Sequence, residues 1–405
     1  MHIPVVGKTG ELCAIGLEIF SHRPSQRATV PKRLERNEKM VFKNKYLRWS
    51  LNTVIGIIVI FGLTLIVLLS WRNIEQNNVA ERRAIGTANG IEITEVASIG
   101  GIDQSINIRG KDLDNPVLLF VHGGPGHAMT PFAHSFQDSW EDDFTVVQWD
   151  QRNVGKTYFL NDPTEVGKTM SVERMAEDLI EVSQYLIKRL GKKKIFILGH
   201  SWGSVIGTMA AKQHPELYHA YIGTGQVISM TEGELLGYEQ TLKLARERSN
   251  KEAIAELEAI APYPNQKFDG IEIRSNWIVQ FGQSYYGESS LDGPLLSKAL
   301  YSPDYTLNDL SYFVRRPVPN WFLDAMPDID LRKLGYDFDI PIIFMIGAHE
   351  WQTPYPLVQD YYEQISAPYK NLIFFDKSSH FPFMSDPDNF AKILKEELLP
   401  IASKP

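Results

Sequence analysis

Short apolar runs alternate with amphipathic segments from about residue 84 to the C-terminus. Eight runs of four to seven residues are predicted strands, most of them continuously apolar as in strands buried on both faces. Apolar residues recur at helical spacing in Val172–Leu190, and Ser204–Gln213 and Asp388–Leu399 are further predicted helices. The predicted strands are Gly90–Val96, Ile102–Ile108, Pro116–Val121, Phe144–Trp149, Ile195–Leu198, Ala220–Gly223, Pro341–Ile346 and Leu372–Phe375. This alternation predicts an α/β fold, with a mostly parallel sheet and helices on both of its faces.

Residues 226–321 interrupt the alternation. They contain two helix-like stretches, Glu232–Arg248 and Glu252–Ile260, followed by a region rich in aromatic residues. Because no further strand–helix repeat is visible there, we expect a helical cap inserted into the α/β core. The core would then consist of residues 85–225 and 322–405.

A membrane-spanning helix is predicted near the N-terminus. No charged residue lies between Arg48 and Arg72, a stretch of 23 residues. As a helix this stretch would be roughly 34 Å long, enough to cross a hydrocarbon core of about 30 Å. Trp49 and Trp71 mark its ends, where tryptophan favours the membrane–water interface. We therefore expect a transmembrane helix over residues 49–71.

The flanks of this stretch predict its type and orientation. Ser70 is followed by a tryptophan and an arginine, which is a poor cleavage site, so an uncleaved signal anchor is expected. Residues 1–50 carry ten Lys/Arg and four Glu, a net charge of +6. The positive-inside rule then places a basic tail, residues 1–48, in the cytoplasm. A linker, residues 72–84, would lead to an extracytoplasmic catalytic domain. Met40 is an alternative start of the native chain.

The overall charge sharpens this division and excludes other classes of protein. The chain has 41 Lys+Arg and 49 Asp+Glu, a net charge of −8, so residues 51–405 carry −14. An acidic domain argues against a general nucleic-acid binder. The single cysteine, Cys13, excludes an internal disulfide framework and a cysteine-based zinc site.

The clearest chemical motif is Gly199–Gly203, which has the form G-x-S-x-G between a predicted strand and a predicted helix. This strand–turn–helix context is that of a nucleophile elbow, in which glycines on both sides of the serine allow a tight turn. Ser201 is the predicted nucleophile. It would lie at a helix N-terminus, where the helix dipole favours a developing negative charge.

A second glycine-rich loop, His122–Gly126, follows another predicted strand. In folds with a nucleophile elbow, this loop supplies one donor of the oxyanion hole, and the residue after the serine supplies the other. We therefore predict that the backbone N–H groups of Gly124 and Trp202 form the oxyanion hole.

A serine nucleophile needs a base and an acid, in the chain order serine, acid, histidine. His380 follows the last predicted strand and is the predicted base. Glu350 is the single carboxylate in the loop after the preceding strand and is the predicted acid, with Asp376 and Asp330 as alternatives.

Several other sequence patterns resemble cofactor- or metal-binding motifs but do not match them. Gly155–Thr157 and Gly167–Thr169 resemble the end of a phosphate-binding loop, but each lacks the first glycine of that motif. No spacing of ligands indicates zinc or calcium. We expect neither a cofactor nor a metal.

Together these motifs resemble the α/β-hydrolase superfamily, and more narrowly the proline iminopeptidase-like serine peptidases, over about residues 85–403. The resemblance rests on His122–Gly126, Trp149–Arg152, the elbow with tryptophan after its serine, and His214–Glu216. It implies an α/β-hydrolase fold with a cap, and a glutamate of the cap that binds the free amine of the substrate. By this resemblance Glu234 is a candidate for that role.

Three positions depart from the family pattern. His200 stands where the elbow of the family usually has glycine, and Asn153–Thr157 replaces a Gly-x-Gly-Arg-Ser sequence. Glu350 stands where the acid is normally aspartate. These departures leave the fold and the triad in place but question strict specificity for proline.

The expected function is a membrane-anchored aminopeptidase that acts on small peptides through an acyl-enzyme. An esterase using the same triad is one alternative, and a catalytically silent surface receptor is another. The expected partners are a small peptide or ester and the lipid bilayer, without nucleic acid; the oligomeric state is left open.

Overall fold

The computed structural model describes residues 32–265, 270–290, 292–316 and 320–403. The chain divides into two compact units, residues 1–68 and 69–405. The described part of the first unit belongs to helix α1 (Lys32–Arg83), which continues into the second unit. The segment Lys45–Arg83 is long and apolar enough to cross a membrane, and its most apolar window has a mean hydropathy of 2.8 and no buried residue.

The second unit is built on an eight-stranded sheet in the order β1-β2-β4-β3-β5-β6-β7-β8. Strands β1 and β2 pair antiparallel, β2 also pairs antiparallel with β4, and all further pairs are parallel. All eight predicted strands are therefore present in a mostly parallel sheet. Their bounds are β1 (Ile91–Ile99), β2 (Ile102–Gly110), β3 (Val117–Val121), β4 (Thr145–Asp150), β5 (Ile195–His200), β6 (Tyr218–Thr224), β7 (Ile342–Gly347) and β8 (Lys370–Phe375).

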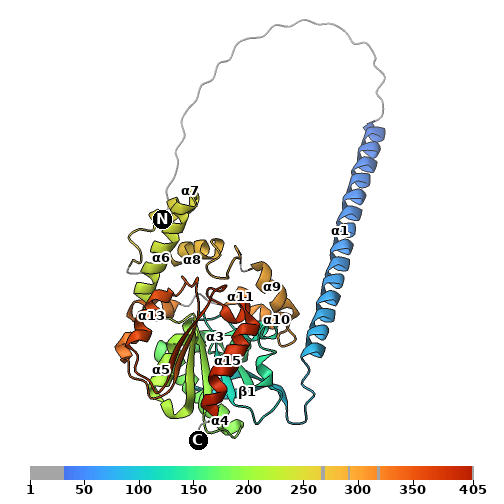
Figure 1. Ribbon diagram of the computed structural model, residues 1–405. Helices are drawn as coiled ribbons and strands as arrows, with labels where there is room; N and C mark the ends of the chain where they lie inside the picture. Colours follow the sequence, from blue (N-terminus) through green and yellow to red (C-terminus); the bar gives the residue numbers. More distant parts are fainter. Residues whose placement is uncertain (1–31, 266–269, 291, 317–319, 404–405) are drawn as a thin grey trace, which may run out of the picture. The chain divides into compact units, whose positions relative to one another are not determined.

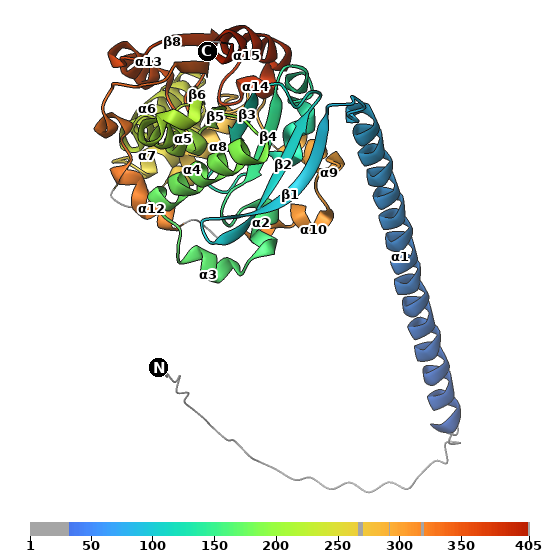
Figure 2. The same ribbon diagram turned by 90° about the horizontal axis from the view of Figure 1, so that it is seen from below.

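Helices cover both faces of the sheet, because its central strands are apolar on both sides. One face packs against α4 (Val172–Arg189) and α5 (Trp202–Gln213), and the other against α15 (Pro387–Ala402), as Figure 2 shows. The predicted helices at these places are confirmed to within a few residues. Shorter helices complete the core: α2 (Gly155–Leu160), α3 (Pro163–Gly167), α13 (Tyr355–Gln364) and α14 (Pro382–Ser385).

Between β6 and β7 the described residues form helices and no strand. Several of these helices gather at one end of the sheet (Figure 1), as expected for an inserted helical cap. They are α6 (Met230–Glu247), α7 (Lys251–Ala259), α8 (Ile271–Gln280), α9 (Asp292–Tyr301), α10 (Leu307–Leu310), α11 (Tyr312–Arg315) and α12 (Asn320–Ala325).

The structure describes only part of the N-terminal region on which the sequence predictions fall. Residues 72–83, expected as part of a linker, form the last turns of α1, and Val79 and Arg83 are buried there. The side chain of Arg83 forms ion pairs there with Asp138, Glu141 and Asp304, contacts that composition alone does not reveal. Cys13 and most of the predicted tail lie outside the described residues.

Candidate active site

Ser201 occupies the sharp turn between β5 and α5. Its φ of 54° and ψ of −121° lie in a region that non-glycine residues rarely adopt. The turn is tight because the chain passes close to its neighbours: a Cβ atom on Gly203 would lie 2.0 Å from the carbonyl oxygen of Val121. The backbone N–H of Ser201 donates to the carbonyl of Thr224 at 3.1 Å. The predicted nucleophile elbow thus has the expected local geometry.

His380 and Glu350 form a buried pair in the loops that follow β8 and β7. The Nδ1 atom of His380 lies 2.7 Å from Oε2 of Glu350, and both side chains are at most 1% exposed. The second carboxylate oxygen accepts hydrogen bonds from the backbone N–H groups of Gln352 at 2.8 Å and Thr353 at 3.0 Å. A carboxylate accepts at both oxygens, so Nδ1 of His380 carries the proton and Nε2 is free to act as a base.

The loop after β6 brings the imidazole of His380 beside the elbow. Gly225 has a φ of 51°, and a Cβ atom there would lie 2.8 Å from Cε1 of His380 and 3.3 Å from Cδ2 of His200. The preceding residue, Thr224, accepts the backbone hydrogen bond of Ser201. The structure therefore brings the predicted serine, histidine and acid to one end of the sheet.

The predicted oxyanion loop lies against the serine. A Cβ atom on Gly123 would lie 2.8 Å from Cβ of Ser201, so only glycine permits this approach. Gly124 has a φ of 117°, a conformation that favours glycine. As the first residue of α5, Trp202 has a backbone N–H without an acceptor inside its helix. Gly124, Trp202 and Ser201 line the same cavity.

His200 fixes the backbone of the loop that carries His380. Its Nε2 atom lies 2.9 Å from the carbonyl oxygen of His380, so Nε2 carries the proton and donates. Nδ1 of His200 is buried, with no hydrogen-bond partner in the described part of the chain. Burial and the neighbouring His380 lower the pKa of His200 well below its usual value, so its ring is neutral. The sequence revealed His200 only as a departure from the family pattern.

Ser284, which sequence analysis missed, joins the acid loop to the histidine loop. Its carbonyl oxygen accepts hydrogen bonds from the backbone N–H of His380 at 3.0 Å and from the hydroxyl of Ser379 at 2.8 Å. Its own hydroxyl donates to Oε1 of Gln352 at 2.9 Å. No local pattern could have identified it, because it lies almost a hundred residues before His380.

The residues that follow β4 make hydrogen bonds and an ion pair that hold the site residues in place. The side chain of Gln151 donates to the carbonyl of His122 at 2.9 Å and accepts from the indole N–H of Trp202 at 3.3 Å. Arg152 makes a fully buried ion pair with Asp178, at 2.7 Å. These motif residues therefore connect the glycine-rich loop and the elbow to the core.

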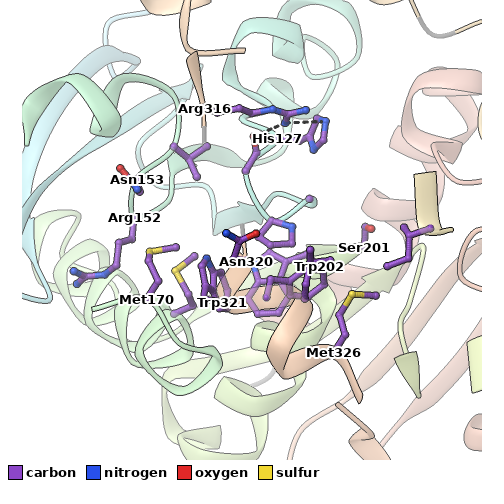
Figure 3. A pocket seen from close by; sticks show the side chains of 18 of the residues that line it. His127, Arg152, Asn153, Met170, Ser201, Trp202, Arg316, Asn320, Trp321 and Met326 are labelled. Atoms are coloured by element: carbon purple, nitrogen blue, oxygen red, sulfur yellow. Dashed lines mark hydrogen bonds between the residues drawn. The ribbon is translucent and has the colours of Figure 1, made fainter. Parts of the chain in front are cut away.

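A cavity of about 870 Å³ opens next to Ser201. Its walls come from the glycine-rich loop, from α5 and from the inserted helices, and Figure 3 shows Trp202, Trp321 and Met326 grouped on one side. Arg316 donates to Nε2 of His127 at 3.0 Å at another part of the wall. The mostly apolar lining suits a small ligand held by a few polar groups.

Glu234 lies in the wall of this cavity but is not a free anion. One carboxylate oxygen accepts from Nη2 of Arg274 at 2.6 Å, and the other accepts from the hydroxyl of Tyr263. Burial, and then the charge of Glu234, raise the pKa of Tyr263, so it remains a donor. The predicted amine-binding glutamate is therefore at the cavity, with its charge already compensated by Arg274.

The alternative acids are placed elsewhere. Asp330 caps the short 3-10 helix Leu331–Leu334 and pairs with Arg332 at 2.8 Å, whereas Asp376 is exposed. The residues Gly155–Thr157 begin α2, where the backbone N–H of Lys156 donates to Asp150. Among the residues the structure describes, no group of three or more His, Cys, Asp or Glu side chains could hold a metal ion.

Comparisons with known proteins point to one family of serine hydrolases. The model of the family described as Serine aminopeptidase, S33, matches residues 114–388. The probable aminopeptidase YbaC of Bacillus subtilis (strain 168) is 28% identical over 309 residues, covering 75% of this chain and 95% of that protein. The proline iminopeptidase of Heyndrickxia coagulans is 20% identical over 293 residues, covering 70% of this chain and 90% of that protein.

Solved structures agree on the fold. VinJ has a TM-score of 0.54 at 18% identity, covering 76% of this chain and 99% of its own. A membrane phospholipase A described as a bacterial virulence factor has a TM-score of 0.56 at 15% identity, covering 87% and 99%. The fold is the α/β-hydrolase fold.

Proposed function

The chain belongs to the serine aminopeptidase S33 family, and we propose that it is a membrane-anchored serine hydrolase that removes N-terminal residues from small peptides. The observation that carries this proposal is the buried pair of His380 and Glu350, 2.7 Å apart beside the elbow of Ser201. In this proposal Ser201 is the nucleophile, His380 the general base and Glu350 the acid that orients the imidazole.

The proposed reaction is acyl transfer through a covalent intermediate. Nε2 of His380 takes the hydroxyl proton as Oγ of Ser201 attacks the substrate carbonyl carbon, and the carbonyl oxygen becomes an oxyanion. The backbone N–H groups of Gly124 and Trp202 stabilise that oxyanion. His380 then gives its proton to the leaving amine as the C–N bond breaks, and a water molecule hydrolyses the acyl-enzyme by the same steps.

An aminopeptidase needs a group that recognises the free amine of its substrate. We propose that Glu234 contributes to this recognition, as an acceptor in the cavity wall whose charge is shared with Arg274. The names of the aminopeptidase and proline iminopeptidase relatives support this substrate class.

A second candidate, an esterase or another small-acyl hydrolase, is favoured by the same residue. Both oxygens of Glu234 already accept hydrogen bonds, so less negative charge is available to a substrate amine. An ester without an amine would need no such charge.

We further propose that residues 49–71 anchor the protein in the cell membrane. The apolar helix supports this anchor, and the net charge of +6 on residues 1–50 supports a cytoplasmic N-terminus with an extracytoplasmic catalytic unit. Protease treatment of sealed right-side-out vesicles tests the orientation. Digestion of the catalytic unit is expected, and its protection would contradict the proposed topology.

Labelling of the full chain in its membrane by a fluorophosphonate tests the nucleophile. Wild type and the Ser275→Ala control, which alters another serine of the cavity wall, should be labelled, and Ser201→Ala should not. Equal labelling of Ser201→Ala would overturn the assignment.

A substrate panel then separates the two candidates. It contains aminoacyl-naphthylamides, prolyl included, the same compounds with an acetylated amine, and short-chain p-nitrophenyl esters. Cleavage of the free-amine amides and not of the acetylated ones is expected, and cleavage of esters alone would refute the aminopeptidase.

A further inference from the structure

The last turns of α1 bind the chain segment between α9 and α10. The guanidinium of Arg72 donates to the carbonyl of Tyr305 at 2.9 Å. The side-chain amide of Gln76 donates to the carbonyls of Ser302 and Tyr305. Two side chains on one helix thus satisfy the backbone of one short turn.

Arg83, three turns further along, joins the same segment to the core. Its side chain is 1% exposed and contacts Asp304 at 3.2 Å, Asp138 at 2.6 Å and Glu141 at 3.1 Å. A buried arginine held by three carboxylates fixes the helix end in one position, since the charge of Arg83 would lose its compensation if the helix end moved away from them. A helix that served merely to connect an anchor to a domain would need no such contacts.

The turn held in this way continues into the wall of the cavity. Tyr305 is 1% exposed, donates its hydroxyl to Asp150 and packs in one apolar cluster with Val154 and Tyr312. Val154 and Tyr312 line the cavity, and the hydroxyl of Tyr312 donates to the carbonyl of Gly126 at 3.0 Å. This apolar cluster therefore connects the turn held by α1 to the wall of the cavity that Ser201 also lines.

We propose that Arg72, Gln76 and Arg83, here called the juxtamembrane clamp, are positioning residues that hold this wall in the shape that binds substrate. The inference rests on the proposed hydrolase site. It gives residues 69–83 a part in substrate binding beyond that of a connection to the membrane. Since Arg72 directly follows the apolar stretch 49–71, the clamp begins where the proposed span ends.

The test compares full-length variants in their membrane with two fluorophosphonates, one with an ethyl group and one with a bulky aromatic group that occupies the cavity. Arg72→Ala/Gln76→Ala removes three hydrogen bonds to the turn and leaves Arg83 in place. We expect about tenfold slower labelling by the aromatic probe and unchanged labelling by the ethyl probe. The control is Arg82→Ala, because the side chain of Arg82 is 60% exposed and only approaches Asp138 at 4.0 Å; both its rates should equal those of wild type.

Hydrogen exchange on the same proteins supplies a readout that does not need activity. The clamp variant should exchange the amides of residues 302–316 about tenfold faster, with β5 unchanged. Unchanged exchange there, or equal effects on both probes, would overturn the clamp. If wild type is not labelled at all, the proposed nucleophile fails, while the exchange of residues 302–316 still decides whether the clamp exists.

Discussion

His200 donates a hydrogen bond from Nε2 to the carbonyl oxygen of His380 at 2.9 Å, and the two imidazole rings lie 4.7 Å apart. His200 is the last residue of β5, and His380 lies in the loop after β8. The hydrogen bond therefore ties the strand that presents Ser201 to the loop that presents the proposed base. A glycine at position 200, usual in the resembling family, could not make this contact.

Replacing His200 with phenylalanine should slow the reaction while leaving the fold in place. Phenylalanine keeps a ring against Phe381 and Phe383 but has no donor for the carbonyl of His380. Because a single hydrogen bond contributes about 1 kcal/mol, we expect kcat/KM to fall roughly five- to tenfold. Steady-state kinetics and the rate of fluorophosphonate labelling measure the effect.

His219→Phe is the matched control for this variant. His219 is on β6, packs against Phe196 and does not contact the proposed triad. Its kinetics should equal those of wild type. Equal kinetics for His200→Phe as well would show that the hydrogen bond to His380 has no part in the reaction.

Glu350→Gln should lower kcat by about a thousandfold or more. Both oxygens of Glu350 accept hydrogen bonds, one from His380 and the other from two backbone N–H groups. An amide has one oxygen, so its NH2 group must face either His380 or the backbone, and in the first case the imidazole adopts the wrong tautomer. Single-turnover kinetics with circular dichroism as a check of folding measures this loss. If Glu350→Gln keeps activity near that of wild type, another carboxylate must serve as the acid.

The sequence predicted the elements and the local motif well, because each depends on neighbouring residues. The apolar strands and the turn at Ser201 are local patterns, and chain order then located Glu350 and His380. The contacts of Ser284 and Arg83 depend on residues about 60 to 220 positions away, so no periodicity or spacing signals them. The resemblance suggested Glu234 as a candidate substrate contact, but its pairing with Arg274, forty residues later, could not be foreseen for the same reason.

Gly124→Ala should reduce kcat about a hundredfold or more through the oxyanion hole. The φ of 117° strains any residue with a side chain, and a Cβ atom would lie 2.5 Å from the backbone nitrogen of Gly126. The loop must shift, which moves the proposed N–H donor away from the oxyanion. Gly167→Ala is the control, since Gly167 lines the same cavity with open space around its Cα. A comparable loss of kcat in both variants would argue against the oxyanion role.

Stability should decrease as the pH falls below 6.5, in part because of His122. Burial lowers the pKa of His122 from 6.5 to about 4, and its Nε2 accepts a hydrogen bond from the backbone of Gln151. In the unfolded chain His122 is protonated as the pH falls through 6.5, whereas in the folded chain it stays neutral until about pH 4. The contribution of neutral His122 to the free energy of unfolding is therefore complete above pH 6.5 and is lost as the pH falls from 6.5 to about 4. The difference between the two pKa values of His122 corresponds to about 3 kcal/mol in the free energy of unfolding.

Urea denaturation of the detergent-solubilised protein at several pH values measures this loss. His122→Gln should flatten the dependence between pH 6.5 and 4, and His214→Gln, at the exposed end of α5, should leave it unchanged. The same slope in His122→Gln and wild type would exclude His122 as its source.

Glu234→Gln should destabilise the protein more than the removal of Glu234 and Arg274 together. Glu234 and Arg274 are 7% and 3% exposed, so the single variant leaves a buried guanidinium without its counter-charge, at a cost of about 3–5 kcal/mol. Glu234→Gln/Arg274→Met removes both charges and should recover most of that loss, because methionine occupies a similar volume without a charge. The exposed pair of Arg246 and Glu258 is the control, and Glu258→Gln should cost less than about 1 kcal/mol. If the double variant is less stable than Glu234→Gln, then Arg274 is held mainly by contacts other than its ion pair with Glu234.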